Sequence, residues 1–156
     1  MDILKENTNI YFQQINSKYD IDNIIKKFNN VLAVLNINNY YEILDKLTNY
    51  SDFIVAYKDT ENILGYIAIY ANDYNSKIAY ITLIAVNRKY QGQGIGKKLI
   101  KKAEDISSSR DFEKIRLEVH KENCNAIHFY ENLGFKQEKD NDETFYMIKE
   151  MGNNIE

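Results

Sequence analysis

The sequence predicts a mixed α/β fold: a twisted, mostly antiparallel sheet with a central parallel strand–helix–strand unit and flanking helices. The hydrophobic period alternates between about 3.6 and 2 along the 156 residues, which indicates helices and strands in one chain. Several strand-like runs follow one another with short links, as antiparallel neighbours do. One helical segment, 94–107, separates two strand-like runs, and such a crossover is expected to be parallel and right-handed.

Composition favours one domain spanning 1–156, which we expect to be cytoplasmic. Hydrophobic residues make up 44% of the chain, and the formal net charge is −3. No long block of like charge indicates a nucleic-acid partner. The single cysteine fits a reducing compartment. We see neither a signal peptide nor a stretch of about 18 apolar residues, so no membrane partner is expected.

The first third of the chain predicts a strand followed by two helices. The strand covers 9–14. The first helix begins at Asp20, the expected N-cap, and its apolar residues continue at helical spacing to Leu35. The second helix covers about 38–50. We expect these variable helices, about 20–50, to lie on the acceptor side of a site.

The rest of the chain, about 52–150, predicts the sheet and two further helices. Asn123 is the expected cap of the last helix and Gly134 its stop signal. The predicted strands are 52–59, 63–71, 78–86, 113–120, 135–140 and 143–151, and the predicted helices are 94–107 and 123–133.

The stretch "RKYQGQGIGKKLI", 88–100, holds three of the six glycines in the chain. It joins a strand end to a helix start, where free N–H groups and the positive end of the helix dipole favour a phosphate. The alternative is a tight turn without a ligand. The dinucleotide fingerprint fails because Lys97 replaces its third glycine. The nucleoside-triphosphate loop fails because Lys98 stands in the Ser/Thr place.

What remains, Q-x-x-G-x-G from Gln91 to Gly96, resembles the coenzyme A pyrophosphate loop of the GNAT superfamily of N-acetyltransferases, [RQ]-x-x-G-x-[GA]. A second stretch, "LEVHKENCNAIHFYENLGF" (117–135), is similar to that family's later strand–helix segment. The two motifs occur in the family's order and spacing. The resemblance covers about 50–150, whereas the first 50 residues fit only the family's variable start.

The resemblance implies a site for acetyl-CoA as co-substrate, without a metal. In the family the fourth and fifth strands splay apart, and the pantetheine arm lies between them. Backbone groups of one strand would meet the pantetheine, those of the loop would meet the pyrophosphate, and an asparagine would contact the coenzyme arm. The implied coenzyme-binding residues are Ile84, Ala85, Val86, Gln91, Gly92, Gln93, Gly94, Ile95, Gly96, Lys97, Asn123 and Tyr130.

The resemblance also implies two catalytic residues for direct acetyl transfer to a primary amine. Tyr130 matches the tyrosine that often protonates the departing thiolate, although it could instead be a core aromatic. Glu118 occupies a strand position similar to that of a general base in members that acetylate protein N-termini. An exposed strand glutamate is the alternative, and an ordered water could replace it as the base.

The remaining predictions concern metal ligands, the amine acceptor and the oligomeric state. His120, His128 and Cys124 are expected to have no catalytic or metal role. The amine acceptor is either a peptide N-terminus or a small molecule such as a polyamine, amino sugar or aminoglycoside, and the chain is a monomer or homodimer. A non-catalytic acyl-CoA-binding regulatory module is the alternative function. The candidate acceptor contacts are Phe28, Tyr40, Tyr41, Glu42 and Asp45.

Overall fold

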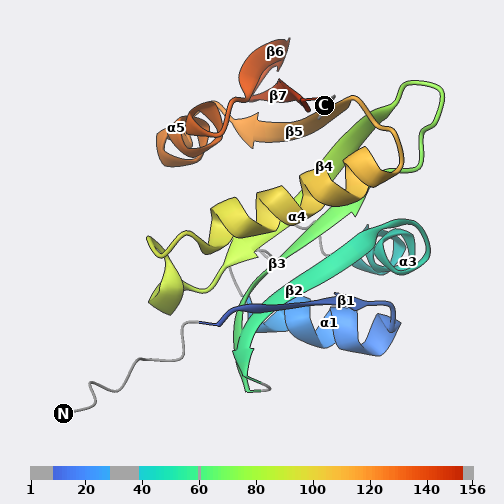
Figure 1. Ribbon diagram of the computed structural model, residues 1–156, viewed down its shortest axis with the longest axis vertical. Helices are drawn as coiled ribbons and strands as arrows, with labels where there is room; N and C mark the ends of the chain where they lie inside the picture. The colour runs from blue at the N-terminus through green and yellow to red at the C-terminus, as the bar shows by residue number, and fades with distance from the viewer. Residues whose placement is uncertain (1–8, 29–38, 60, 153–156) are drawn as a thin grey trace.

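The computed structural model describes residues 9–28, 39–59 and 61–152, and in them seven strands form one sheet (Figure 1). The sheet order is β1–β2–β3–β4–β5–β7–β6. All neighbouring strands are antiparallel except β4 and β5, which confirms the predicted mixed sheet. The elements are β1 (Tyr11–Ile15), α1 (Lys18–Lys27), α3 (Tyr40–Tyr50), β2 (Asp52–Asp59), β3 (Asn62–Tyr70), β4 (Ile78–Val86), the 3₁₀ turn η2 (Arg88–Tyr90), α4 (Ile95–Ser109), β5 (Lys114–His120), α5 (Cys124–Asn132), β6 (Lys136–Asn141) and β7 (Thr144–Glu150).

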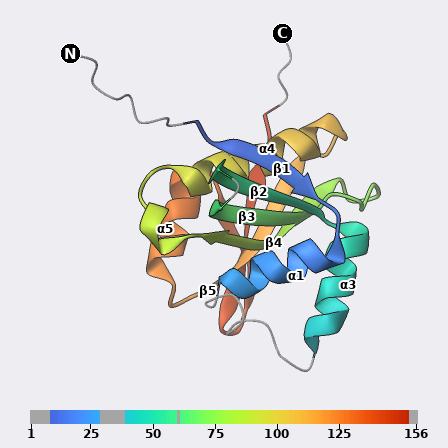
Figure 2. The same cartoon turned by 90° about the horizontal axis from the view of Figure 1, so that it is seen from below.

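Helices cover both faces of the sheet, with α1 and α3 on one face and α4 and α5 on the other (Figure 2). Strand β2 shows how the sequence produces this arrangement. Ile54 and Ala56 pack in the cluster that holds α4 and α5, whereas Phe53 and Val55 pack in the cluster that holds α1 and α3. Strands buried on both faces read as continuous apolar runs, as this one does.

Most predicted boundaries agree with the structure to within two residues, but the predicted cap of α1 is wrong. The helix begins at Lys18, and the Ser17 hydroxyl accepts a hydrogen bond of 3.3 Å from the backbone N–H of Asp20. Serine is as good a cap as aspartate, and the capping residue here lies three positions earlier than expected. The helix ends at Lys27, with Phe28 as its C-cap, so it does not continue unbroken to Leu35 as predicted; residues 29–38 lie outside the described ranges.

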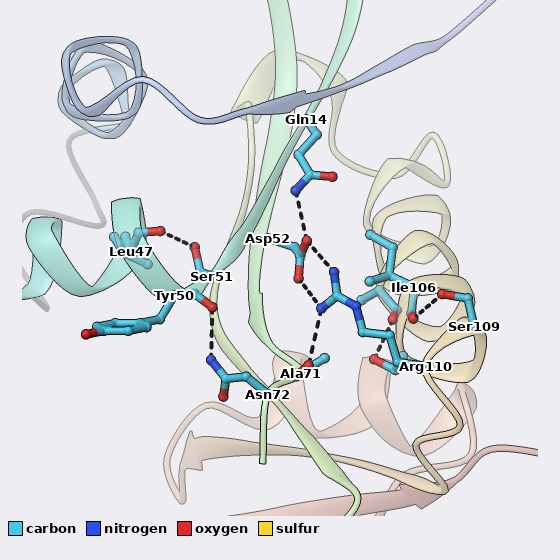
Figure 3. Close-up of polar contacts among 12 residues, drawn as sticks. Gln14, Leu47, Tyr50, Ser51, Asp52, Ala71, Asn72, Ile106, Ser109 and Arg110 are labelled. Atoms are coloured by element: carbon cyan, nitrogen blue, oxygen red, sulfur yellow. Dashed lines mark hydrogen bonds and ion pairs between the residues drawn. The ribbon is translucent and has the colours of Figure 1, made fainter. Parts of the chain in front are cut away.

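A partly buried ion pair fixes the end of α4 to the sheet (Figure 3). Arg110 follows the last turn of α4 and donates two hydrogen bonds of 2.6 and 2.9 Å to the Asp52 carboxylate, and a third to the Ala71 carbonyl. The Gln14 side chain also donates to Asp52 at 2.8 Å. This Asp52 network, formed by Gln14, Asp52, the Ala71 carbonyl and Arg110, therefore connects α4 with β1, β2 and the end of β3.

None of the helices within these described ranges is both long and apolar enough to cross a lipid bilayer.

Candidate active site

The central parallel pair of strands separates after three residues. Pairing runs from Ile78 opposite Lys114 to Tyr80 opposite Arg116 and then ends, although both strands continue (Figure 1). A bulge lies at this point, because Ile69 pairs with Ile81 whereas the preceding Ala68 pairs with Leu83. This bulge belongs to the β3–β4 pair, and it bends β4 at the position where β4 and β5 separate. We call the unpaired region, residues 81–86 and 117–120, the β4–β5 divergence.

Strand β4 keeps its partner β3 through this region, up to Val86 opposite Gly65. Its other edge has no partner strand in the part of the chain that the structure describes. Backbone groups on such an edge can bind an extended ligand as an added strand would. Ile84, Ala85 and Val86, three of the predicted coenzyme residues, lie at the end of this edge.

The glycine-rich loop follows directly and ends at the start of α4. Gly92 and Gly94 have φ values of 83° and 81°, a left-handed conformation that favours glycine. A Cβ atom at either position would meet nothing within 4 Å, so the space beside both residues is open. Gly94 caps α4 without a side chain, and the first intrahelical bond is donated by Lys98. The preceding N–H groups therefore lack intrahelical acceptors.

Other loop residues have distinct positions. Gln91 donates a hydrogen bond of 3.2 Å from its side chain to the Val86 carbonyl, which holds the loop against the strand end. Gln93 and Lys97 are exposed, whereas Ile95 is buried in the core. The structure thus places the predicted loop residues at one end of β4.

Gly96 has a different physical role from the other two glycines in the loop. A Cβ atom there would lie 3.0 Å from Cζ of Phe129, so the missing side chain allows α4 and α5 to pack closely. Nothing in the neighbouring sequence marks Phe129 as the reason for this glycine. The contact places α5, and with it Tyr130, beside the start of α4.

Tyr130 and Asn123 belong to α5. The Tyr130 ring is 8% exposed and forms edge contacts with Phe129 and Phe135. Burial raises the pKa of the Tyr130 phenol to about 12, so it holds its proton at neutral pH. Asn123 caps α5 as predicted, because its side chain accepts a hydrogen bond of 3.2 Å from the backbone N–H of Ala126.

Glu118 lies on the exposed side of β5, near two tyrosines that no sequence motif marks. Tyr146 is its direct partner on β7, and Tyr80 lies on β4. The pKa of Tyr146 is raised, chiefly by interaction with Glu118. Burial and then the charge of Glu118 raise the pKa of Tyr80 to about 12. Strand alternation predicts the direction of these side chains, but their proximity depends on the register.

Tyr130 and Glu118 lie on opposite faces of the sheet. Tyr130 packs in the α4–α5 cluster, whereas Glu118 alternates with the buried residues Leu117 and Val119 of that cluster and so points to the α1–α3 side. The β4–β5 divergence lies between these sides. Tyr130 and Glu118 could therefore approach a ligand in this region from opposite faces of the sheet.

The candidate acceptor contacts are partly occupied by internal interactions. The Tyr40 hydroxyl donates to Asp22, and Asp45 pairs with Lys18. Phe28 packs edge-on against Tyr66. By contrast, Tyr41 and Glu42 are exposed. These contacts favour a structural role for three of the five residues.

The described residues contain no group of three His, Cys, Asp or Glu side chains arranged to hold a metal ion. His120, His128 and Cys124 are all exposed.

Comparison with known proteins gives consistent results. The sequence model of the "Acetyltransferase (GNAT) family" matches residues 19–135. N-alpha-acetyltransferase 30 of Schizosaccharomyces pombe is 41% identical over 56 residues, which are 36% of this chain and 37% of that protein. A Bacillus subtilis protein named as an alanine N-acetyltransferase of ribosomal protein bS18 is 30% identical over 99 residues, which are 62% of this chain and 60% of that protein.

The chain thus spans about a third of the yeast relative. Among solved structures, the PaiA N-acetyltransferase of Thermoplasma acidophilum in complex with coenzyme A superposes with a TM-score of 0.71 and 23% identity. The match covers 92% of this chain and 99% of that one, and at this identity it shows the fold.

Proposed function

Because this chain belongs to the GNAT acetyltransferase family, we propose that it transfers an acetyl group from acetyl-CoA directly to a primary amine. One observation carries the proposal. The unpaired edge of β4 and the open glycine-rich loop lie at the same end of the sheet, next to α5. The extended part of one ligand would bind along the strand edge, and its phosphates would bind the free N–H groups of the loop.

In this proposal the pantetheine arm lies along Ile84–Val86 and the pyrophosphate meets the backbone from Gln91 to Lys97. Open space beside Gly92 and Gly94 and the absence of a side-chain cap on α4 support the phosphate position. The exposed Lys97 would add positive charge. Asn123 would contact the coenzyme arm while it caps α5.

The proposed chemistry uses the two sides of the divergence. The amine nitrogen forms a bond to the acetyl carbonyl carbon, and the carbon–sulfur bond breaks. Tyr130 gives its proton to the coenzyme A thiolate, and the raised pKa of this phenol means that the proton is present at neutral pH. Glu118, or an ordered water, takes a proton from the incoming ammonium, and the second proton that the nitrogen loses on becoming an amide returns through solvent to the Tyr130 phenolate.

The acceptor that the comparisons favour is the α-amine of a peptide. Two relatives have names that describe N-alpha or alanine N-acetyltransferases. Small-molecule amines, namely polyamines, amino sugars and aminoglycosides, are the alternative within the same reaction. A non-catalytic acyl-CoA-binding module is the alternative outside it, and the presence of both Tyr130 and Glu118 argues for catalysis.

Thiol release from acetyl-CoA, measured against a panel of amines, tests the proposal. The panel contains peptides with free N-termini, polyamines, amino sugars and aminoglycosides, and thermal shift with acetyl-CoA is measured in parallel. We expect turnover with peptides and stabilisation by acetyl-CoA. Turnover only with a small amine would replace the peptide acceptor. Stabilisation without turnover on any amine would favour the binding module.

A further inference from the structure

Arg116 spans the exposed face of the C-terminal half of the sheet. It starts on β5 opposite Ile148 of β7, and its guanidinium ends at Glu138 on β6. Two parallel bonds join the pair: Nε donates to Oε2 at 2.8 Å and Nη2 donates to Oε1 at 2.7 Å. The guanidinium carbon lies 5.9 Å from the centre of the Tyr146 ring on β7. The side chain is thus extended away from its own strand.

The direction of Arg116 matters because Glu118 is two residues further along the same strand. Residues at this spacing point to the same face and lie roughly 6–7 Å apart. An arginine side chain can cover that separation, and a guanidinium beside a carboxylate strongly favours its charged form. A carboxylate stabilised in this way is a weaker proton acceptor.

We propose that Glu138 is a positioning residue, which holds the Arg116 guanidinium on β6 and so keeps it away from the Glu118 carboxylate. Glu138 acts through Arg116 and touches neither substrate nor coenzyme. This proposal rests on the role proposed above for Glu118 as the base that accepts the amine proton.

The other groups that face Glu118 are compatible with this arrangement. Tyr80 lies on β4, His120 on β5 and Tyr146 on β7. Both tyrosines keep their protons at neutral pH, because the pKa of each phenol is raised. Within these three strands, the basic residues nearest to Glu118 in sequence on the same face are Arg116 and His120. Of these two, Arg116 alone is permanently charged.

On α1, which covers this face of the sheet, two lysines form ion pairs with residues other than Glu118. Lys18 of α1 pairs with Asp45 of α3, and Lys26 pairs with Asp22 within α1.

The direct test is titration of the Glu118 carboxyl by ¹³C NMR in protein labelled at glutamate, because this readout needs no acceptor. The Glu118 signal is identified by its loss in Glu118→Gln. In Glu138→Gln we expect the titration midpoint to fall by roughly 0.5–1 pH unit, since the released guanidinium moves toward Glu118. In the double variant Glu138→Gln/Arg116→Gln the midpoint should equal that of Arg116→Gln alone.

Turnover gives the second readout. With the best amine of the panel, kcat/KM of Glu138→Gln should fall about threefold to tenfold, and the limb of the pH profile that Glu118→Gln removes should move to lower pH. Glu138→Asp keeps the charge and should retain the wild-type profile. Asp140→Asn is the matched control. Asp140 lies on β6 like Glu138, but its ion pair is with Lys121, so the substitution leaves the Arg116–Glu138 pair intact.

The inference is overturned if the Glu118 midpoint is the same in Glu138→Gln and wild type. It is also overturned if Glu138→Gln lowers the Glu118 midpoint by the same amount in the Arg116→Gln background. The same conclusion follows if Asp140→Asn lowers the midpoint as Glu138→Gln does. These outcomes differ from failure of the proposed base. An unchanged midpoint with an inactive Glu118→Gln leaves the base in place, whereas a fully active Glu118→Gln removes it.

Discussion

The two ends of α4 contrast in how their polar groups are satisfied. At the C-terminal end, Arg110 joins the Asp52 network, where the carboxylate accepts three described hydrogen bonds (Figure 3). At the N-terminal end, Gly94 gives no side-chain cap and the adjacent space is open. An exposed helix N-terminus leaves free N–H groups that can bind an anion. The open end is therefore where the proposed phosphate would bind, and at the closed end the Asp52 network holds α4 against the sheet.

This contrast predicts that substitutions at the open end change binding or turnover and that substitutions at the closed end change stability.

Tyr130→Phe should give the largest effect at the open end. The ring packing against Phe129 and Phe135 is kept, but the proton for the thiolate is lost. We expect kcat to fall by about 100-fold or more, with little change in acetyl-CoA affinity or in the melting temperature. Steady-state thiol release measures this, and Tyr74→Phe, an exposed tyrosine, is the control. Unchanged kcat would remove Tyr130 as the acid.

Arg110→Met should give the largest effect at the closed end. The Asp52 side chain is 9% exposed, so it would become a buried charge with Gln14 as its remaining side-chain partner. We expect the free energy of unfolding to fall by about 2 kcal/mol, measured by denaturant titration. The control Lys101→Met removes an exposed pair with Asp105 and should cost under about 0.5 kcal/mol. A loss of kcat per folded molecule in Arg110→Met would contradict the separation of the two ends.

Asn123→Ala tests a residue that would serve both stability and binding. Loss of the α5 cap should lower the free energy of unfolding by about 1 kcal/mol. If Asn123 also contacts the coenzyme, acetyl-CoA binding weakens as well. Asn123→Ser keeps a capping oxygen on a shorter side chain, so it should restore stability without restoring affinity. Full affinity in Asn123→Ala would limit this residue to capping.

The pH dependence should show the smallest change. The pKa of Tyr130 is raised from 10.0 to about 12, so the phenol remains protonated through pH 10. Its preference for the neutral form stabilises the fold below pH 10, and this contribution is lost as the pH rises through 12. We expect no fall in kcat between pH 7 and 10 from ionisation of Tyr130. A fall there that disappears in Tyr130→Phe would contradict this.

The sequence predicted the fold and the loop well because both depend on local patterns. The apolar runs at 52–59 and 78–86 and the glycines at 92 and 94 are readable from neighbouring residues. The GNAT resemblance supplied the roles of Tyr130 and Glu118, which remain proposals.

What the sequence did not predict depends on contacts between distant segments. Arg110 and Asp52 are 58 residues apart, and nothing local marks them as partners. The same holds for the contact of Gly96 with Phe129 and for the position of Tyr146 beside Glu118. The cap of α1 was wrong for a different reason: Ser17 and Asp20 are both good capping residues, and local preference alone did not separate them.

The most direct test of the contrast between the two ends is calorimetric titration of acetyl-CoA into wild type and Gly94→Glu. The introduced carboxylate would lie in the open space at the start of α4, where the phosphates are proposed to bind. Gly94→Asn controls for the left-handed backbone, and Gly152→Glu controls for the added charge. We predict that Gly94→Glu weakens binding at least about 100-fold, equal to roughly 2.7 kcal/mol, while Gly152→Glu binds as wild type. Wild-type affinity in a folded Gly94→Glu would contradict the account.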